Sequence, residues 1–374
     1  MNSDVLGKIL TVSKPVAPPW NDSSKNLVRD LAMHGDRFSY RVLTTADYQL
    51  VGRQVSCEQI YQQRGSHTPT LRQNLKVLAR LLRGDDTSIT HFFFAPNPKS
   101  SWAGALASKL RARRTVQTVC SIPASFASTR RLLFADRVIV LSEHTARCFA
   151  DAGFPAERLH VIPPGIALPA RPDAETRAAT RRRHNVALDA DLVVFPGDYQ
   201  FSRAAQTVAE AAIKLRRPKT VFVFACRVKQ QASRLEEDRI RRMLSQAGIM
   251  GSVRLYNQLD DILDVLGAAD ACILPAESLF AKMDLPMVLI EALAMGVPII
   301  VGDQPPLVEI MRGEIGMAIP AVDPTALADA LSKLLNNKSL HGQLSDNARR
   351  VARDHFDVRN MVRRYEDLYA EMLR

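Results

Sequence analysis

Short apolar runs alternate with helical patterns along most of the chain, and this alternation restricts the possible fold more than any other feature. Runs of the strand type include FSYRVLTT in the first half and TVFVFA in the second. Segments of the helical type include DSSKNLVRDLAMHG and RAAQTVAEAAIKL, whose apolar residues recur at helical spacing. Runs that are apolar at successive positions are typical of parallel strands buried on both faces. The alternation therefore predicts an α/β fold with a doubly wound sheet in each half.

The stretch IPPGIALPARPDAETRAAT divides the two halves, because its prolines and glycine end one sheet and its charged residues precede the next helix. A chain of 374 residues also exceeds one ordinary core. We expect one domain over residues 1–166 and a second from residue 167 onward. Two such domains facing each other would bring their strand ends to a shared cleft, where phosphate-bearing ligands bind.

The chain is basic, with a net charge of +11 and a pI near 9.6. This charge favours an anionic partner, namely phospholipid headgroups, nucleic acid or a phosphorylated substrate, although an ordinary solvated surface explains it as well. No aromatic residues are interleaved with the basic clusters, so a membrane surface is favoured and nucleic acid is not expected. The clusters lie at residues 109–114, 130–131, 181–183 and 216–217.

Three features of the sequence bear on the cellular compartment of the protein. Its start has no basic region followed by an apolar one, and no apolar run approaches the ~18 residues that span a bilayer. The five cysteines form no CxxC pair, which fits a reducing compartment and argues against a structural zinc site. We expect a cytoplasmic protein, with peripheral association at the inner face of a membrane as a separate hypothesis.

One carboxylate stands out in an apolar segment. Residues 287–295 form an expected helix, with Pro286 in its first turn and Gly296 just past its end, and Glu291 is the only polar residue within it. An ionised glutamate there is costly unless it is paired or hydrogen-bonded. Two hydroxyl groups of a ribose would be suitable partners, and so would a loop backbone or an arginine.

The segment EALAMGVPIIVGD resembles the donor-site signature of the family 4 retaining glycosyltransferases, which have the GT-B fold of two Rossmann-like domains facing a central cleft. Three more segments are similar to that family: ADRVIVLSEHTARCFADAGFPAERLHVIPPGI, LYNQLDDILDVLGAADACILPA and HFDVRNMVRRYEDLYAEML. The resemblance implies that residues 1–166 are the acceptor side and 167–355 the nucleotide-sugar side. It also implies that residues 356–374 return to the N-terminal domain.

The resemblance implies that Glu291 binds the donor ribose. A second acid of the family's E-x7-E pattern would fall at Met283, so Asp284 is its substitute only if the register shifts by one residue. The backbone N–H groups of Asp284 and Leu285 are expected to face the diphosphate, with Lys282 adding positive charge.

A second phosphate element of the family follows the first strand of the nucleotide domain. The chain keeps its glycine as Gly197 and has Arg203 where the family has a lysine, but Asp198 takes the place of an arginine and reverses its charge. Arg227, after the next strand, is a candidate replacement for that cation, and a solvated loop charge is the alternative. The lost contact is worth ~1.5–3 kcal/mol.

On the N-terminal side, Asn21 and Asp22 stand in the family's first loop. They either cap the following helix or meet the acceptor or donor phosphate. His91 opens a strand and is interpreted as structural, and no residue is assigned as a general base.

The implied reaction moves a sugar from a nucleotide diphosphate sugar to an acceptor with retention of configuration, without a metal or other cofactor. Its setting would be the synthesis of cell-envelope polysaccharide, glycolipid or related glycoconjugate. Two rivals stay open: another enzyme of the same fold, such as a nucleotide-sugar epimerase or a phosphorylase, and a non-catalytic protein that binds a nucleotide sugar or a partner.

Overall fold

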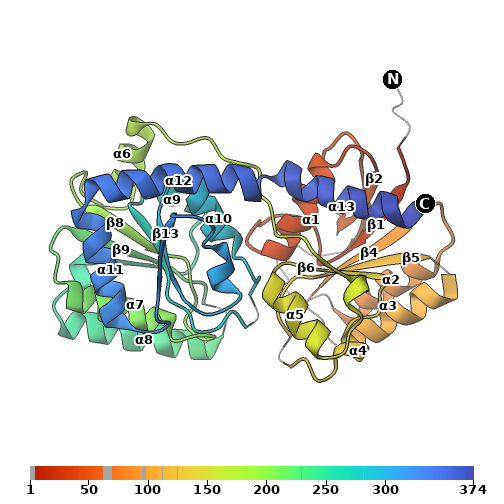
Figure 1. Cartoon of the computed structure of the whole chain (residues 1–374), viewed down its shortest axis with the longest axis horizontal. Coiled ribbons are helices and arrows are strands. Elements are labelled where there is room, and N and C mark those ends of the chain that lie inside the picture. The colour runs from red at the N-terminus through yellow and green to blue at the C-terminus, as the bar shows by residue number, and fades with distance from the viewer. Residues whose placement is uncertain are drawn as a thin grey trace. The chain divides into compact units, whose positions relative to one another are not determined.

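The structure, a computed structural model, describes residues 5–61, 70–94, 98–111, 113–123, 125–228, 230–280 and 282–374. The chain forms two compact units (Figure 1). The first contains Met1–Ala167, Phe280–Leu285 and Phe356–Arg374, and the second contains Leu168–Leu279 and Pro286–His355. The expected boundary after residue 166 is one residue from the observed change of unit. The inclusion of Phe280–Leu285 in the first unit was not expected.

The first unit holds a parallel sheet of seven strands in the order β3-β2-β1-β4-β5-β6-β7. The chain winds outward from β1 in both directions, as predicted for a doubly wound sheet. Its elements are β1 (Lys8–Val12), α1 (Ser23–His34), β2 (Ser39–Thr45), β3 (Val55–Tyr61), α2 (Leu71–Leu82), β4 (Ile89–Phe94), α3 (Pro98–Arg111), β5 (Arg114–Val119), α4 (Thr129–Leu132), β6 (Arg137–Val140), α5 (Glu143–Asp151), η1 (Ala156–Arg158), β7 (Leu159–Val161) and α13 (Val358–Leu373).

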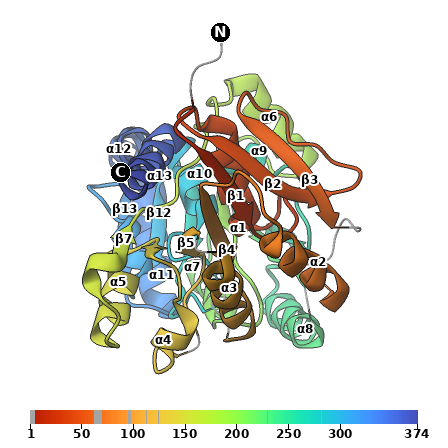
Figure 2. The ribbon, with the colours of Figure 1, turned by 90° about the vertical axis from the view of Figure 1, so that its right-hand side faces the viewer.

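Helices cover both faces of this sheet (Figure 2). One face packs against α2 and α3 through a core that includes Leu10, Phe92, Leu81 and Ala107. The other face meets α13. There His91 is buried on β4, its Nδ1 lies 2.5 Å from the Tyr369 hydroxyl, and burial lowers the pKa of its ring. The structure therefore places His91 inside the packing of the C-terminal helix, in keeping with a structural role.

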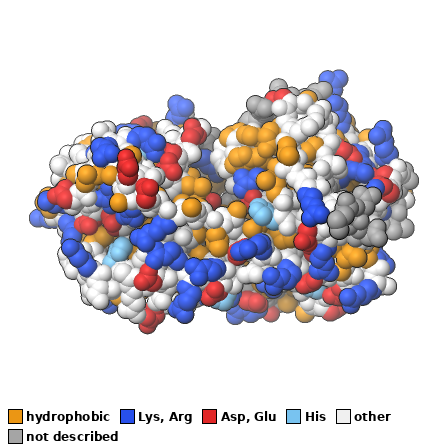
Figure 3. Space-filling view, turned by 90° about the horizontal axis from the view of Figure 1, so that it is seen from above, with side chains coloured by type: hydrophobic (Ala, Val, Ile, Leu, Met, Phe, Trp, Pro, Cys, Tyr) orange, Lys and Arg blue, Asp and Glu red, His pale blue; other side chains and the backbone are white. Residues whose placement is uncertain are grey.

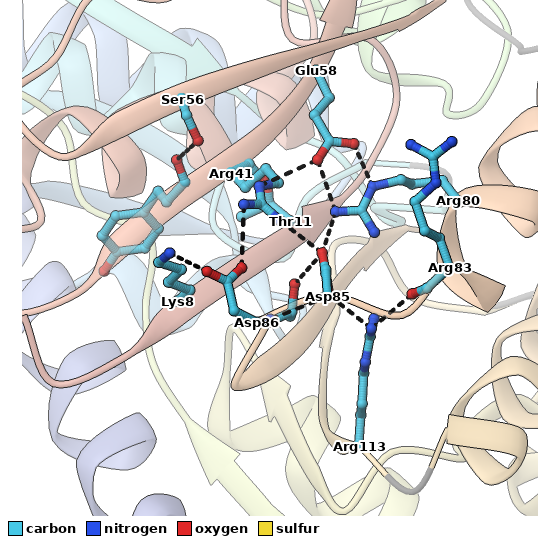
Figure 4. Close-up of polar contacts among 12 residues, drawn as sticks. Lys8, Thr11, Arg41, Ser56, Glu58, Arg80, Arg83, Asp85, Asp86 and Arg113 are labelled. Atoms are coloured by element: carbon cyan, nitrogen blue, oxygen red, sulfur yellow. Dashed lines mark hydrogen bonds and ion pairs between the residues drawn. The ribbon is translucent and has the colours of Figure 1, made fainter.

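The amino-terminal edge of the same sheet carries a network of ion pairs (Figure 4). Arg80 from α2 pairs with Glu58 of β3 and, at 2.6 Å, with Asp85. Asp85 also forms ion pairs with Arg41, at 2.6 Å, and with Arg113, at 2.7 Å. Burial alone would raise the pKa of Asp85, but its hydrogen bonds with Arg80 and Thr87 lower it to about 2. These charges satisfy one another within the fold.

The second unit holds a parallel sheet of six strands in the order β10-β9-β8-β11-β12-β13. The prediction of a doubly wound parallel sheet in each half is therefore confirmed. Its elements are α6 (Ala174–Arg183), β8 (Asp191–Phe195), α7 (Ala204–Leu215), β9 (Thr220–Ala225), α8 (Gln231–Gln246), η2 (Met250–Ser252), β10 (Val253–Tyr256), α9 (Ile262–Ala268), β11 (Ala271–Leu274), α10 (Met287–Ala294), β12 (Ile299–Gly302), η3 (Leu307–Ile310), β13 (Gly316–Ile319), α11 (Pro324–Asn336) and α12 (Lys338–Phe356).

The short apolar helix expected around Glu291 is present as α10. Pro286 is its N-cap residue rather than part of its first turn. Gly296 follows its C-cap with a φ of +78°, a left-handed conformation in which a glycine is favoured.

Candidate functional site

In the second unit, β8 lies between β9 and β11. The chain leaves β8 through α7 toward β9, and it later returns to the opposite side of β8 as β11. The carboxyl ends of β8 and β11 therefore form a topological switch point, where ligands bind in open α/β sheets. Two loops meet there: residues 196–203 after β8, and the segment that follows β11.

The loop after β8 is shaped by Gly197 and Asp198. A Cβ on Gly197 would lie 2.0 Å from the Phe195 ring, so only a glycine fits at this position. Asp198 is buried, and its Oδ1 accepts hydrogen bonds from the N–H groups of Gln200 and Phe201 at 2.9 and 2.7 Å. The acid that replaces the family's arginine thus satisfies two amides of the same loop.

The next acid at the switch point is Glu277, which sequence reasoning missed. Arg203 is the N-cap residue of α7, and its side chain makes no capping hydrogen bond. Its backbone N–H instead donates to both carboxylate oxygens of Glu277, at 3.0 and 3.3 Å. The Arg203 side chain is exposed. An internal carboxylate therefore occupies the start of α7, the position where a phosphate would otherwise receive an N–H donor.

Glu291 lies on α10, half-buried between the fully buried side chains of Ile290 and Ala292. It is close enough to β11 to affect Cys272. Burial raises the pKa of that thiol, and the negative charge of Glu291 raises it further. The Glu291 side chain is therefore partly shielded from solvent within its own unit.

Arg227 directly follows Cys226 after β9, the strand beside β8, and its side chain is half-buried. Because parallel strands end at one edge of a sheet, Arg227 shares that edge with Gly197 and Arg203. The strand order thus places three predicted residues, Gly197, Arg203 and Arg227, at the same edge of the second sheet.

In the first unit, Asp22 is the N-cap residue of α1, as one of the two sequence interpretations predicted. Its Oδ1 accepts the Ser24 N–H at 3.0 Å, and its Oδ2 lies 2.7 Å from Lys14 Nζ. Burial alone would raise the pKa of Asp22, but the charge of Lys14 and the hydrogen bonds from Lys14 and Ser24 hold it well below its ordinary range. Asn21 is half-buried beside it.

Lys282, Met283, Asp284 and Leu285 all belong to the segment that packs within the first unit. Asp284 is 1% exposed, and Ser142 Oγ donates to its Oδ2 at 2.6 Å. The same Ser142 oxygen caps α5 by accepting the Thr145 N–H at 3.1 Å. Met283 and Leu285 are buried, and Lys282 is half-buried.

The described residues offer neither a cluster suited to a metal ion nor a membrane-spanning helix. Within the described ranges, no group of three or more His, Cys, Asp or Glu side chains is placed to hold a metal ion. Among the helices described, none is both long and apolar enough to cross a membrane.

Comparison with known families accounts for most of the chain. Residues 24–168 match the model described as Glycosyltransferase Family 4, and residues 176–351 match the model described as Glycosyl transferases group 1.

The chain also resembles curated relatives named as a glycosyltransferase and a mannosyltransferase, and one solved structure over nearly its whole length. The chain is 25% identical over 209 residues to D-inositol 3-phosphate glycosyltransferase of Xylanimonas cellulosilytica, covering 54% of this chain and 48% of that protein. It is 35% identical over 107 residues to phosphatidyl-myo-inositol mannosyltransferase of Mycobacterium leprae, covering 28% of each. The chain thus spans at most about half the length of these relatives. The structure is also similar to that of HepE from Anabaena, solved with UDP and glucose, with a TM-score of 0.78, 17% identity, and coverage of 97% of this chain and 99% of that chain.

Two doubly wound parallel sheets, with polar loops gathered at a switch point, define a two-domain α/β protein of the GT-B type. The two family models, which match one unit each over most of its length, identify the family. The chain belongs to the family 4 glycosyltransferases.

Proposed function

We propose that the protein transfers a sugar from a nucleotide diphosphate sugar to an acceptor with retention of configuration. The observation that carries the proposal is the half-buried carboxylate of Glu291, on the otherwise apolar helix α10 of the second unit. Family membership supports a transferase. A nucleotide sugar as donor is supported by HepE, which was solved with UDP-glucose, and by the relatives named as GDP-mannose-dependent mannosyltransferases.

In this proposal Glu291 accepts hydrogen bonds from the two ribose hydroxyls, since one carboxylate can accept both. Gly197 lets the loop pass close to the diphosphate. Arg203 and Arg227 contribute the positive charge that stabilises the departing diphosphate, the main electrostatic demand of the reaction. No metal or other cofactor is assigned a role.

The segment before α10 would complete the phosphate site. We assign the backbone N–H groups of Asp284 and Leu285 to the diphosphate, with Lys282 adding charge, as in the family pattern. Asn21 and Asp22 would border the acceptor. Because Asp22 already caps α1, it would act there through its remaining lone pairs. The acceptor class is a cell-envelope polysaccharide, glycolipid or related glycoconjugate.

A second candidate, a non-catalytic protein that binds a partner rather than a nucleotide sugar, is favoured by one specific observation. Asp198 and Glu277 place two carboxylates on the amides of the loop that should receive a diphosphate. A catalytic site needs Glu277 to give way when the donor binds, whereas a non-catalytic protein has no such requirement.

A panel of nucleotide sugars tests the proposal. The correct donor should stabilise the fold by about 2.7 kcal/mol at a hundredfold excess over its dissociation constant. Thermal unfolding identifies the donor, and donor consumption with cell-envelope acceptors then measures turnover. No stabilisation by any nucleotide sugar would favour the partner-binding candidate, and stabilisation without turnover would show binding without catalysis. Conversion of the donor into its epimeric nucleotide sugar, with no glycosylated acceptor, would favour the epimerase.

A further inference from the structure

The basic clusters of the sequence separate into two kinds once their contacts are known. Arg181 is 7% exposed and donates to the carbonyl oxygens of Ala268 and Ala190 and to Asp270. Arg183 pairs with Asp261 and Asp264. Arg181 is therefore unavailable to an anionic partner, and the charge of the exposed Arg183 is offset by two carboxylates of the second unit.

Residue Arg217 of another cluster is likewise held by Asp191 at 2.8 Å. On the face of the molecule in Figure 3, basic side chains are interspersed with acidic ones, so the net charge alone marks no binding surface there. In the cluster at residues 109–114, Arg113 is held by Asp85. The exposed Lys109 on α3 and the exposed Arg130 and Arg131 on α4 remain in the first unit.

Helix α3 exposes three large apolar side chains on one side. Trp102 is 68% exposed, Leu106 39% and Leu110 64%. They recur every four residues, which places them along one stripe of the helix. The opposite side of α3 is buried through Ser101 and Ala107, so the stripe faces away from the core. Large apolar residues aligned on an exposed surface mark an interaction site more often than scattered ones do.

The stripe lies in a basic surrounding. Helices α2, α3 and α4 contain no aspartate or glutamate, and α3 contacts both of the others (Figure 2). The exposed cations of these helices are Arg72, Lys76, Lys109, Arg130 and Arg131. Within the described part of the chain, none of the five forms an ion pair. Leu75 on α2 adds another exposed apolar side chain, at 57%.

We propose that α3, with α2 and α4 beside it, docks the first unit onto an anionic membrane surface. Trp and Leu side chains that protrude from one helix fit insertion into the boundary between headgroups and acyl chains, and Lys and Arg around them match anionic lipid phosphates. This charge complementarity, together with the absence of acids from all three helices, selects an anionic bilayer as the occupant. The site of Glu291 takes no part in the docking.

Vesicle co-sedimentation of the full chain tests the proposal. The protein should bind phosphatidylcholine vesicles that contain about one third phosphatidylglycerol, and bind pure phosphatidylcholine at least about tenfold more weakly. Trp102→Glu and Leu110→Glu should each reduce binding to the anionic vesicles about tenfold or more. Leu235→Glu, a matched change at a 61%-exposed leucine of α8 in the second unit, should leave it unchanged. Raising the salt concentration should weaken binding of the unchanged protein.

A fluorescence measurement reports insertion directly. The chain has two tryptophans, so a Trp20→Phe variant leaves Trp102 as the only one. Its emission should shift to the blue on addition of the anionic vesicles, because the indole leaves water. Equal vesicle binding by the unchanged protein and by Trp102→Glu would overturn the proposal. Failure to bind vesicles, with a dimer that Trp102→Glu dissociates, would also overturn it and assign the stripe to a second copy. Nucleotide binding by Trp102→Glu is measured in parallel. A variant that loses vesicle binding but still binds the nucleotide separates the docking proposal from the proposed function.

Discussion

The first loop of each unit joins its central strand to the following helix, but the two helices are capped in different ways. In the first unit, Asp22 caps α1 from the adjoining residue and is held by Lys14. In the second unit, α7 has no side-chain cap of its own, and the Arg203 N–H is bound by Glu277, 74 residues away in the chain. A local cap forms with the helix itself. A distant cap depends on a second loop, so an incoming anion can replace it.

The comparison predicts that the local cap matters most for stability. Asp22→Ala should lower the free energy of unfolding by about 1–3 kcal/mol, because α1 loses its cap and Lys14 loses its partner. Denaturant unfolding measures the change. Ser23→Ala, at the next position, is the matched control, since no side-chain hydrogen bond of Ser23 is found among the described residues. An equal loss in Ser23→Ala would show that the cap is not the cause.

The side chain at the start of α7 should matter for ligand binding. Arg203→Ala should weaken pyrophosphate and nucleoside diphosphate binding by about 1.5–3 kcal/mol and leave nucleoside binding unchanged, because it removes one charged contact to phosphate. Titration calorimetry with the three ligands separates these effects. Arg216→Ala, at the exposed far end of the same helix, should change none of them. Equal weakening of the nucleoside would remove Arg203 from the phosphate site.

The carboxylate of Glu277 should weaken diphosphate binding, whereas the Arg203 side chain should strengthen it. Glu277→Gln should strengthen diphosphate binding about three- to tenfold, since a neutral amide competes less well for the Arg203 N–H and repels the anion less. Competition with a fluorescent nucleotide gives the affinity. Glu210→Gln, at a half-buried glutamate of α7 that accepts a hydrogen bond from Gln206, is the control for a change of overall charge. Weaker binding by Glu277→Gln would mean that this carboxylate holds the site together rather than blocking it.

A pH series sharpens the comparison further. The pKa of Asp22 is lowered in the fold, so its contribution to stability is complete above the ordinary value of 3.8 and is lost as the pH falls toward the lowered value. The difference in unfolding free energy between the unchanged protein and Asp22→Asn should therefore be constant near neutrality and shrink below about pH 4. A difference that grows with acidity would contradict the Lys14 pairing.

Local patterns in the sequence predicted much of the fold and the positions of several site residues. The alternation of strands and helices, the helix around Glu291 and the cap at Asp22 each follow from residues close together in the chain. The interactions that sequence reasoning missed are long-range. Glu277 binds a residue 74 positions earlier, and Asp284 binds Ser142, 142 positions earlier.

The basic clusters show the same limit of prediction from local sequence. Nothing in residues 181–183 distinguishes Arg181, which is buried among backbone carbonyl groups, from the exposed arginines near α3. Only the folded chain reveals which charges are already satisfied. The sequence predicts only that Asp198 removes a phosphate contact. In the folded loop its carboxylate accepts hydrogen bonds from the N–H groups of Gln200 and Phe201.

The account depends on the ribose assignment of Glu291, and one measurement tests it directly. Binding of a nucleoside diphosphate and of pyrophosphate is compared in the unchanged protein and in Glu291→Ala by titration calorimetry. The account predicts that the variant binds pyrophosphate normally but loses at least about tenfold in affinity for the nucleoside diphosphate, because two hydrogen bonds to a charged acceptor are gone. Equal affinity of both proteins for the nucleoside diphosphate would contradict it.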